Sequence, residues 1–151
     1  MVVVEQATVL EAPVEAVIQA LNEVESIPTW ATVAGKVYNV QGRGLGMTFE
    51  WHYSVEGVDF RGKTEVVEQT TTTLISRTTG DVDSIWTVTL RPISQRSTAM
   101  QVVVEYNPRN RFVEVLADQI IQRYTTPEVA AENLRRFKEM VEARVRITEG
   151  V

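Results

Sequence analysis

Residues 47–55 alternate strictly between large apolar and polar side chains. A period of two predicts a β-strand with one apolar, aromatic face and one polar face that is accessible to solvent. The apolar face consists of Met47, Phe49, Trp51, Tyr53 and Val55. Such a row needs cover, and the only long amphipathic segment that could provide it lies near the C-terminus. The strand therefore borders either a solid core or the wall of a ligand pocket.

Length and composition indicate one ordinary globular domain over residues 1–151, with 44% hydrophobic and 23% charged residues. A net charge of −5 argues against nucleic acid as a partner, because binding a phosphate backbone requires clustered Lys and Arg. The absence of cysteine excludes disulfides, thiol nucleophiles and Cys-type metal sites. No basic leader and no run of about 18 apolar residues occurs, so we expect a cytoplasmic protein without stable membrane insertion.

The N-terminal third predicts one strand followed by two short helical segments. Residues Val2–Leu10 are rich in Val and Thr and end before a proline, which favours a strand leading into a helix. Apolar residues then recur at helical spacing over Pro13–Val24. Glu25–Trp30 restarts at a proline and is long enough only for a turn or a second short helix.

The middle of the chain predicts an antiparallel meander of six strands joined by hairpin-length turns. Turn residues such as Glu56-Gly57, Gly80-Asp81 and Ser94–Ser97 separate short β-rich runs. The expected strands are Lys36–Val40, Met47–Val55, Val58–Gln69, Thr72–Thr79, Ser84–Pro92 and Ser97–Asn107. The polar run Thr70–Thr73 fits either an edge strand or a long turn.

The C-terminal part returns to helical spacing. A short helix is expected within Phe112–Tyr124, which could serve as a lid or contact helix. The last helix starts either with a capping box at Thr125 and Glu128, or with a cap one residue later and Pro127 at the first helical position. It runs for about 20 residues, or roughly 30 Å, which is enough to cross a six- or seven-stranded sheet.

This order of elements resembles the START-like, or SRPBCC, helix-grip superfamily, which includes polyketide cyclase-like and Bet v 1-like proteins. The resemblance rests on Glu11–Glu15, Ile27–Trp30, Gly42–Met47 and Glu65–Glu68. It implies an α+β fold in which a curved antiparallel seven-stranded sheet wraps around a long C-terminal helix. Two short helices separate the first and second strands in that fold. The resemblance also implies a cavity between sheet and helix for apolar molecules.

The residues expected to bind a ligand lie on the inner face of the sheet or on the last helix. They are Phe49, Trp51, Tyr53, Thr64, Trp86, Met100, Tyr106, Asn133 and Phe137. Pocket walls are mostly apolar with a few placed polar groups, and Tyr53, Thr64, Tyr106 and Asn133 fit the second description. The alternative is that the large side chains fill the space themselves, as they do in small cores.

No residue is assigned a catalytic role, and neither a metal nor a cofactor is predicted. The Gly42–Gly46 loop precedes a strand rather than a helix, so we interpret it as a tight turn and not as a phosphate site. His52, the single histidine, should lie on the polar face beside Glu50. The acidic pairs fit solvated charge better than acid–base dyads: Glu65/Glu68, Asp81/Asp83 and Glu139/Glu142.

Three functions remain open at this point. The first is binding or transport of a small hydrophobic or aromatic ligand, lipid-like or polyketide-like, between the sheet and the last helix. The second is an enzyme with polyketide cyclase/aromatase-like or dehydratase-like activity, in which a shaped pocket positions a reactive chain. The third is a co-chaperone-like protein-interaction module. The expected partner is a small apolar ligand, and a homodimer stays open.

Overall fold

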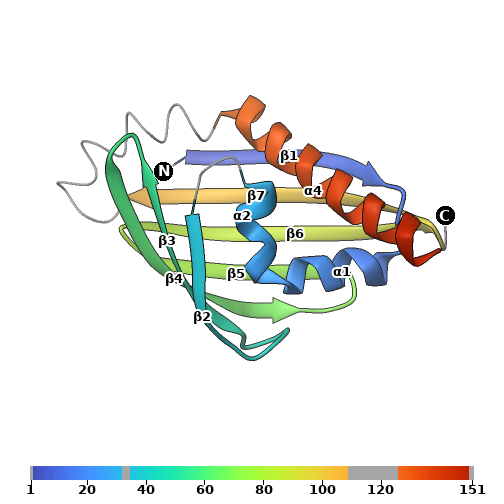
Figure 1. Ribbon diagram of the computed structural model, residues 1–151, viewed down its shortest axis with the longest axis horizontal. Helices are drawn as coiled ribbons and strands as arrows, with labels where there is room; N and C mark the ends of the chain where they lie inside the picture. Colours follow the sequence, from blue (N-terminus) through green and yellow to red (C-terminus); the bar gives the residue numbers. More distant parts are fainter. Residues whose placement is uncertain (1, 32–34, 109–125, 150–151) are drawn as a thin grey trace.

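The chain folds into one curved antiparallel sheet with its helices on one face (Figure 1). The computed structural model describes residues 2–31, 35–108 and 126–149. Seven strands follow the order β1-β7-β6-β5-β4-β3-β2, which confirms the expected seven-stranded antiparallel sheet with a meander and places β1 beside β7. They are β1 Val2–Leu10, β2 Gly35–Gln41, β3 Thr48–Val55, β4 Val58–Gln69, β5 Thr73–Gly80, β6 Val82–Ser94 and β7 Ser97–Pro108.

The helices cover the concave face from two directions. Helix α1 spans Val14–Asn22, a 3-10 turn covers Val24–Ser26, and α2 spans Ile27–Trp30. Helix α4, Pro127–Thr148, runs along β1 (Figure 1). The Thr126 side chain accepts a hydrogen bond from the Val129 amide, so the later of the two expected caps is correct. The helix expected within 112–124 lies outside the described residues.

The strand register confirms which side chains face inward. Phe60 and Thr64 are buried, whereas Arg61 and Lys63 between them are exposed. The polar run 70–73 forms the turn between β4 and β5, because the Thr70 amide donates to the Thr73 carbonyl across it. The sheet therefore presents one continuous inner face to the helices.

The inner face carries two separate hydrophobic clusters. The first lies under α4 and α1 and contains Leu10, Val17, Ala20, Val88, Leu90, Met100, Leu134, Phe137 and Val141, with Ala12. The second surrounds the aromatic strand β3 and contains Val24, Met47, Phe49, Trp51, Val55, Phe60 and Val66. The structure differs here from the sequence expectation, since Val24 and Ile27 rather than α4 pack against the aromatic face of β3.

The glycine-rich loop before β3 is a tight turn, as expected. Gly42, Gly44 and Gly46 have φ values of 82°, 73° and 84°, which side chains with a Cβ rarely adopt. The Gly46 amide donates to the Val66 carbonyl and so ties the turn to β4. This turn ends at a strand and forms no helix N-terminus for a phosphate.

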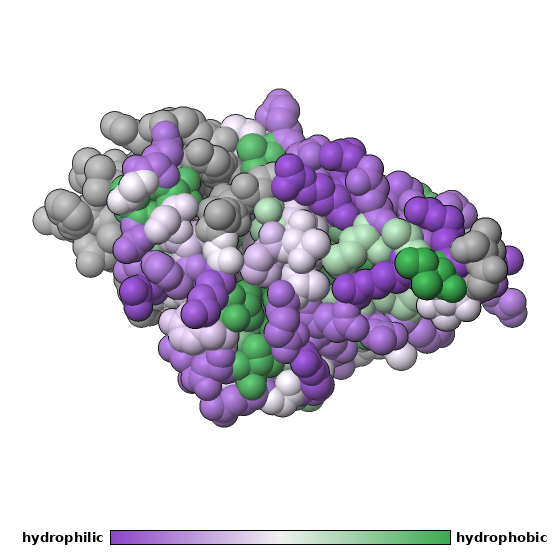
Figure 2. Space-filling model, in the orientation of Figure 1, coloured by the Kyte–Doolittle hydropathy of each residue, from purple (hydrophilic) through white to green (hydrophobic). Residues whose placement is uncertain are grey.

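The helical face has a mostly hydrophilic surface over α4, with apolar atoms visible between the helices and β2 (Figure 2). Within the described ranges, none of the helices combines the length and the apolar character needed to cross a bilayer. The amphipathic α4 directs Leu134, Phe137 and Val141 into the molecule.

Thr98 fixes the position of α1 relative to the sheet. Its fully buried hydroxyl donates a 2.8 Å hydrogen bond to the Ala12 carbonyl, just before α1 begins. We expect Thr98→Val, which keeps the shape but removes the donor, to lower the free energy of unfolding by about 1–3 kcal/mol because the carbonyl is left unpaired. Urea denaturation measures this, and Thr98→Ser, which keeps the hydroxyl, is the control. Equal losses in both variants would contradict this role.

Candidate functional site: an apolar cavity between sheet and helices

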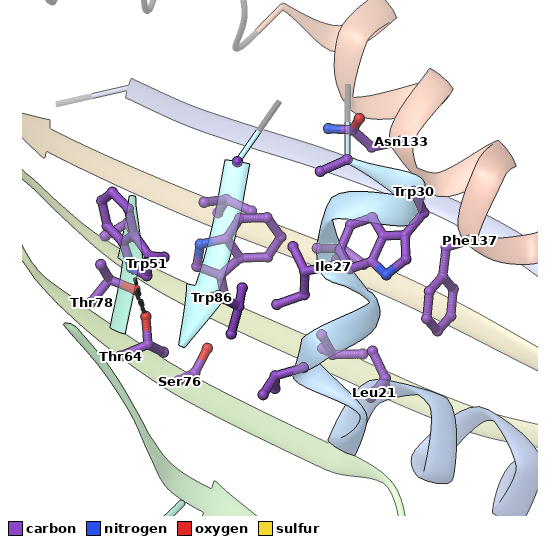
Figure 3. Close-up of a pocket in the computed structure, with 18 of the residues that line it drawn as sticks. Leu21, Ile27, Trp30, Trp51, Thr64, Ser76, Thr78, Trp86, Asn133 and Phe137 are labelled. Atoms are coloured by element: carbon purple, nitrogen blue, oxygen red, sulfur yellow. Dashed lines mark hydrogen bonds between the residues drawn. The ribbon is translucent and has the colours of Figure 1, made fainter. Parts of the chain in front are cut away.

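A cavity of about 320 Å³ lies between the concave face of the sheet and the helices. Its wall is formed by residues from all seven strands, from α1, α2 and the turn between them, and from α4. Figure 3 shows Trp51, Thr64 and Thr78 at one end of this wall, Trp86 and Ile27 in the middle, and Trp30 and Phe137 at the other end. Its volume falls in the range typical of ligand pockets in proteins.

All nine residues expected to bind a ligand lie in the wall of this cavity: Phe49, Trp51, Tyr53, Thr64, Trp86, Met100, Tyr106, Asn133 and Phe137. Seven of them come from strands β3, β4, β6 and β7, and the other two, Asn133 and Phe137, come from α4. The large side chains leave space rather than filling it. Whether each residue touches a ligand stays a prediction.

Trp51 organises the aromatic end of the cavity. Its ring stacks on Tyr53, with ring centroids 4.6 Å apart and an interplanar angle of 13°. The indole also lies directly over Gly62, its partner on β4, where a Cβ would come within 2.2 Å of Cζ2. Its Nε1–H donates to Thr64 Oγ1 at 3.1 Å. Three contacts therefore hold the indole in one orientation.

The opposite end is closed by Trp30 of α2 and Phe137 of α4. Their rings meet edge to face, with centroids 5.5 Å apart and an interplanar angle of 77°. Such a contact adds a favourable electrostatic component to the burial of both rings. The two helices thus close the cavity over the first hydrophobic cluster (Figure 3).

The wall holds few ionisable groups. Among the described lining residues these are Tyr53, Tyr106 and Lys36. Lys36 pairs with His52 at an outward-facing register position and is exposed, so its ammonium lies outside the cavity. Burial raises the pKa of Tyr53 to about 12 and also raises the pKa of Tyr106. Both phenols are therefore neutral near pH 7, and the cavity interior is uncharged.

Sequence analysis missed three hydroxyl residues of the wall: Ser76, Thr78 and Ser84. All three follow the alternation of β5 and β6, but short polar side chains in Thr- and Ser-rich strands look like solvent-facing positions. Thr78 Oγ1 lies 2.6 Å from Thr64 Oγ1, which joins it to the Trp51 hydrogen bond. Continuing the alternation of Trp86 back to Ser84, and that of Leu74 on to Ser76 and Thr78, would have placed all three on the inner face.

His52 lies away from the cavity, on the polar side of β3, as expected. Its Nε2 is 3.5 Å from Asp59 Oδ1, and the Ser54 hydroxyl donates to the same carboxylate oxygen. These contacts, led by the bond from Ser54, lower the pKa of Asp59. A hydrolytic triad would need serine hydrogen-bonded to histidine, whereas here both bind the carboxylate. The described residues also contain no cluster of His, Cys, Asp or Glu suited to a metal ion.

Four of the acidic residues considered as possible dyads have structural partners. Asp81 accepts a hydrogen bond from the Arg61 amide, and Asp83 accepts one from the Gly80 amide. Glu139 pairs with Arg135, and Glu142 pairs with Lys138, both along α4. None of the four lies in the cavity wall.

The curved antiparallel sheet, the long C-terminal helix and the apolar cavity between them together define a helix-grip protein. The family model described as "Polyketide cyclase / dehydrase and lipid transport" matches residues 1–142. The chain therefore belongs to this family. No curated protein sequence matches the chain.

Three solved structures illustrate the likeness in fold. The Zhui aromatase/cyclase from Streptomyces sp. R1128 is 15% identical, with a TM-score of 0.73 and 99% of each chain covered. A START superfamily protein from Mycobacterium smegmatis is 15% identical, with a TM-score of 0.62, covering 97% of this chain and 98% of that one. Norcoclaurine synthase from Thalictrum flavum is 14% identical, with a TM-score of 0.66 and 95% of each chain covered. Identities this low show a shared fold.

The packing of Trp51 on Gly62 can be tested by adding one methyl group. We expect Gly62→Ala to lower the free energy of unfolding by about 1–3 kcal/mol and to weaken the near-UV circular dichroism of tryptophan, because the new Cβ overlaps the indole. The same change in a Trp51→Leu background should cost less, since the overlap is relieved. An equal cost in both backgrounds would contradict the contact.

The buried phenols predict a loss of stability at alkaline pH. An exposed tyrosine has a pKa of about 10, whereas Tyr53 in the folded protein has a pKa of about 12. Between these values only the unfolded state ionises, so stability is complete below pH 10 and falls as pH rises toward 12. The urea midpoint should fall less steeply over this window in Tyr53→Phe than in wild type, with Tyr38→Phe as the control. Identical slopes for wild type and Tyr53→Phe would refute this assignment.

Proposed function

We propose that the protein binds or carries a small hydrophobic or aromatic ligand, lipid-like or polyketide-like, in the cavity between sheet and helices. The observation that carries this proposal is the cavity itself, which has an uncharged wall rich in aromatic and aliphatic side chains. Transfer of an apolar molecule from water into such a space is favourable by roughly 25 cal/mol for each Å² of buried apolar surface. Membership of a family whose description includes lipid transport supports it further.

A cyclase-like enzyme is the second candidate, and the likeness to an aromatase/cyclase over almost the whole chain favours it. Such an enzyme would position a reactive chain and move protons with a few polar groups. The described wall offers only neutral hydroxyls and amides for that purpose, and its two tyrosines have raised pKa values. Proton abstraction at pH 7 would need a stronger base, so we place binding before catalysis.

The remaining hypotheses gain little support. A protein-interaction role depended on the segment 112–124, which lies outside the described residues. We propose a cytoplasmic location because a chain without cysteine depends on no disulfide and is suited to a reducing compartment. A homodimer remains a hypothesis from the sequence.

Native mass spectrometry of freshly purified protein tests the proposal directly. We expect excess mass on the folded protein that disappears on denaturation, because an apolar occupant is held only by the intact cavity. Titration with N-phenyl-1-naphthylamine, an uncharged dye whose fluorescence rises in apolar surroundings, is the second measurement. No excess mass and no binding of this dye would overturn the proposal.

A cavity-filling substitution separates internal binding from adsorption to the surface. Ala130 of α4 lines the cavity, whereas its neighbour Ala131 is exposed. We expect Ala130→Phe to weaken binding of N-phenyl-1-naphthylamine at least tenfold, because the ring occupies ligand space, and Ala131→Phe to leave it within about twofold. Equal effects of the two variants would place the dye outside the cavity.

A further inference from the structure

The inner face of the sheet carries a row of hydroxyl groups across four adjacent strands. Thr64 of β4 pairs with Thr78 of β5, Thr78 pairs with Ser84 of β6, and Ser84 pairs with Tyr106 of β7. Directly opposite residues on neighbouring strands have Cβ atoms about 5 Å apart. All four residues line the cavity. The row is therefore a continuous polar strip in a mostly apolar wall.

The Trp51 indole and the hydroxyls of Thr64 and Thr78 together carry one more donor hydrogen than the hydrogen bonds among them need. The Trp51 Nε1–H donates to Thr64 Oγ1, and the two threonine oxygens lie 2.6 Å apart. These two hydrogen bonds use two of the three hydrogens that the indole and the hydroxyls supply. Among the residues that the structure describes, no acceptor takes the third.

The two threonines are almost fully buried, with 4% and 5% of their surface exposed. A buried hydroxyl hydrogen without an acceptor costs free energy, and a water or a ligand oxygen in the cavity would remove that cost. Figure 3 shows Thr64, Thr78 and Ser76 together at the end of the wall opposite Phe137. An acceptor atom bound here would leave the remainder of its molecule against Trp86 and Ile27.

The same wall disfavours an ionised ligand. Within the part of the chain that the structure describes, a carboxylate at the hydroxyl row would be removed from water with no cation beside it, because Lys36 is exposed at an outward-facing register position. Burial of an unpaired charge costs far more than hydroxyl donors return. A ketone or ester oxygen accepts the same hydrogen without that cost.

We propose that Thr64 and Thr78 form a carbonyl-binding subsite, so that the cavity selects an uncharged apolar ligand with a carbonyl oxygen over the corresponding hydrocarbon and carboxylate. This inference rests on the proposed function, because it names the ligand class of the same cavity. In this subsite a hydroxyl hydrogen of the Thr64–Thr78 pair donates to the carbonyl oxygen of the ligand, and Trp51 holds the pair in place.

Three naphthalenes of nearly equal size test the subsite. They are 2-acetylnaphthalene, which has a carbonyl, 2-isopropenylnaphthalene, which replaces its oxygen with a methylene group, and 2-naphthoate, which is charged. Quenching of tryptophan fluorescence gives the dissociation constants. We expect the ketone to bind about five- to tenfold more tightly than the alkene, which is the difference that one neutral hydrogen bond allows. The difference in affinity between the ketone and the carboxylate should be larger than that.

The double variant Thr64→Val/Thr78→Val removes both hydroxyls at almost constant volume. We expect its preference for the ketone over the alkene to fall to about one, while its affinity for the alkene stays within about threefold of wild type. Binding of the alkene also shows that the variant is folded. Thr79→Val, which changes the exposed outward neighbour of Thr78, is the matched control and should keep the preference.

Each contrary outcome has a separate meaning. Equal binding of ketone and alkene by wild type, or a preference that survives in the double variant, would overturn the carbonyl subsite and leave apolar binding intact. Carboxylate binding as tight as ketone binding would overturn the selection for an uncharged ligand. Failure of all three compounds to bind wild type would overturn the subsite. The proposed function would be overturned only if N-phenyl-1-naphthylamine also failed to bind and native mass spectrometry showed no excess mass.

Discussion

The structure depends on one constraint: a single curved sheet must bury its apolar inner face beneath helices that cover it incompletely. A helix can follow a twisted sheet along a line, and protein interiors elsewhere fill the flanking space with side chains. Here α4 packs over β1 and the first hydrophobic cluster, while the residues around α2 cover the second. The cavity lies between the sheet and both covers, since its wall includes residues of both clusters.

In the second cluster, the side chain of Trp51 is held in one orientation although the cavity beside it is not filled. Trp51 is held by Gly62 below it, by Tyr53 beside it and by Thr64 at its nitrogen. Gly62 has no side chain to compete for that space, so the indole occupies the position that a Cβ would take. A glycine in mid-strand usually weakens a sheet, but here it makes room for one of the three tryptophans of the wall.

Sequence patterns were sufficient for the fold because each depends on local chemistry. The alternation around Trp51, the proline at the start of α4 and the glycines before β3 all predicted the correct elements. Sequence patterns failed to predict which segment covers β3, because tertiary packing determines that. It assigned the cover of β3 to the long helix, although Val24 and Ile27, in a segment too short to show amphipathicity, provide it.

The same limit explains why the hydrogen-bonded pairing of Thr64 with Thr78 was found only in the structure. Thr64 was recognised from its place beside Phe60, yet its partner Thr78 follows by fourteen residues on another strand, with a bulge between the two strands. A bulge shifts the register and therefore which side chains meet across the sheet. Ligand selection in this fold thus depends on pairings between strands, and proteins with the same order of elements can differ in what they bind.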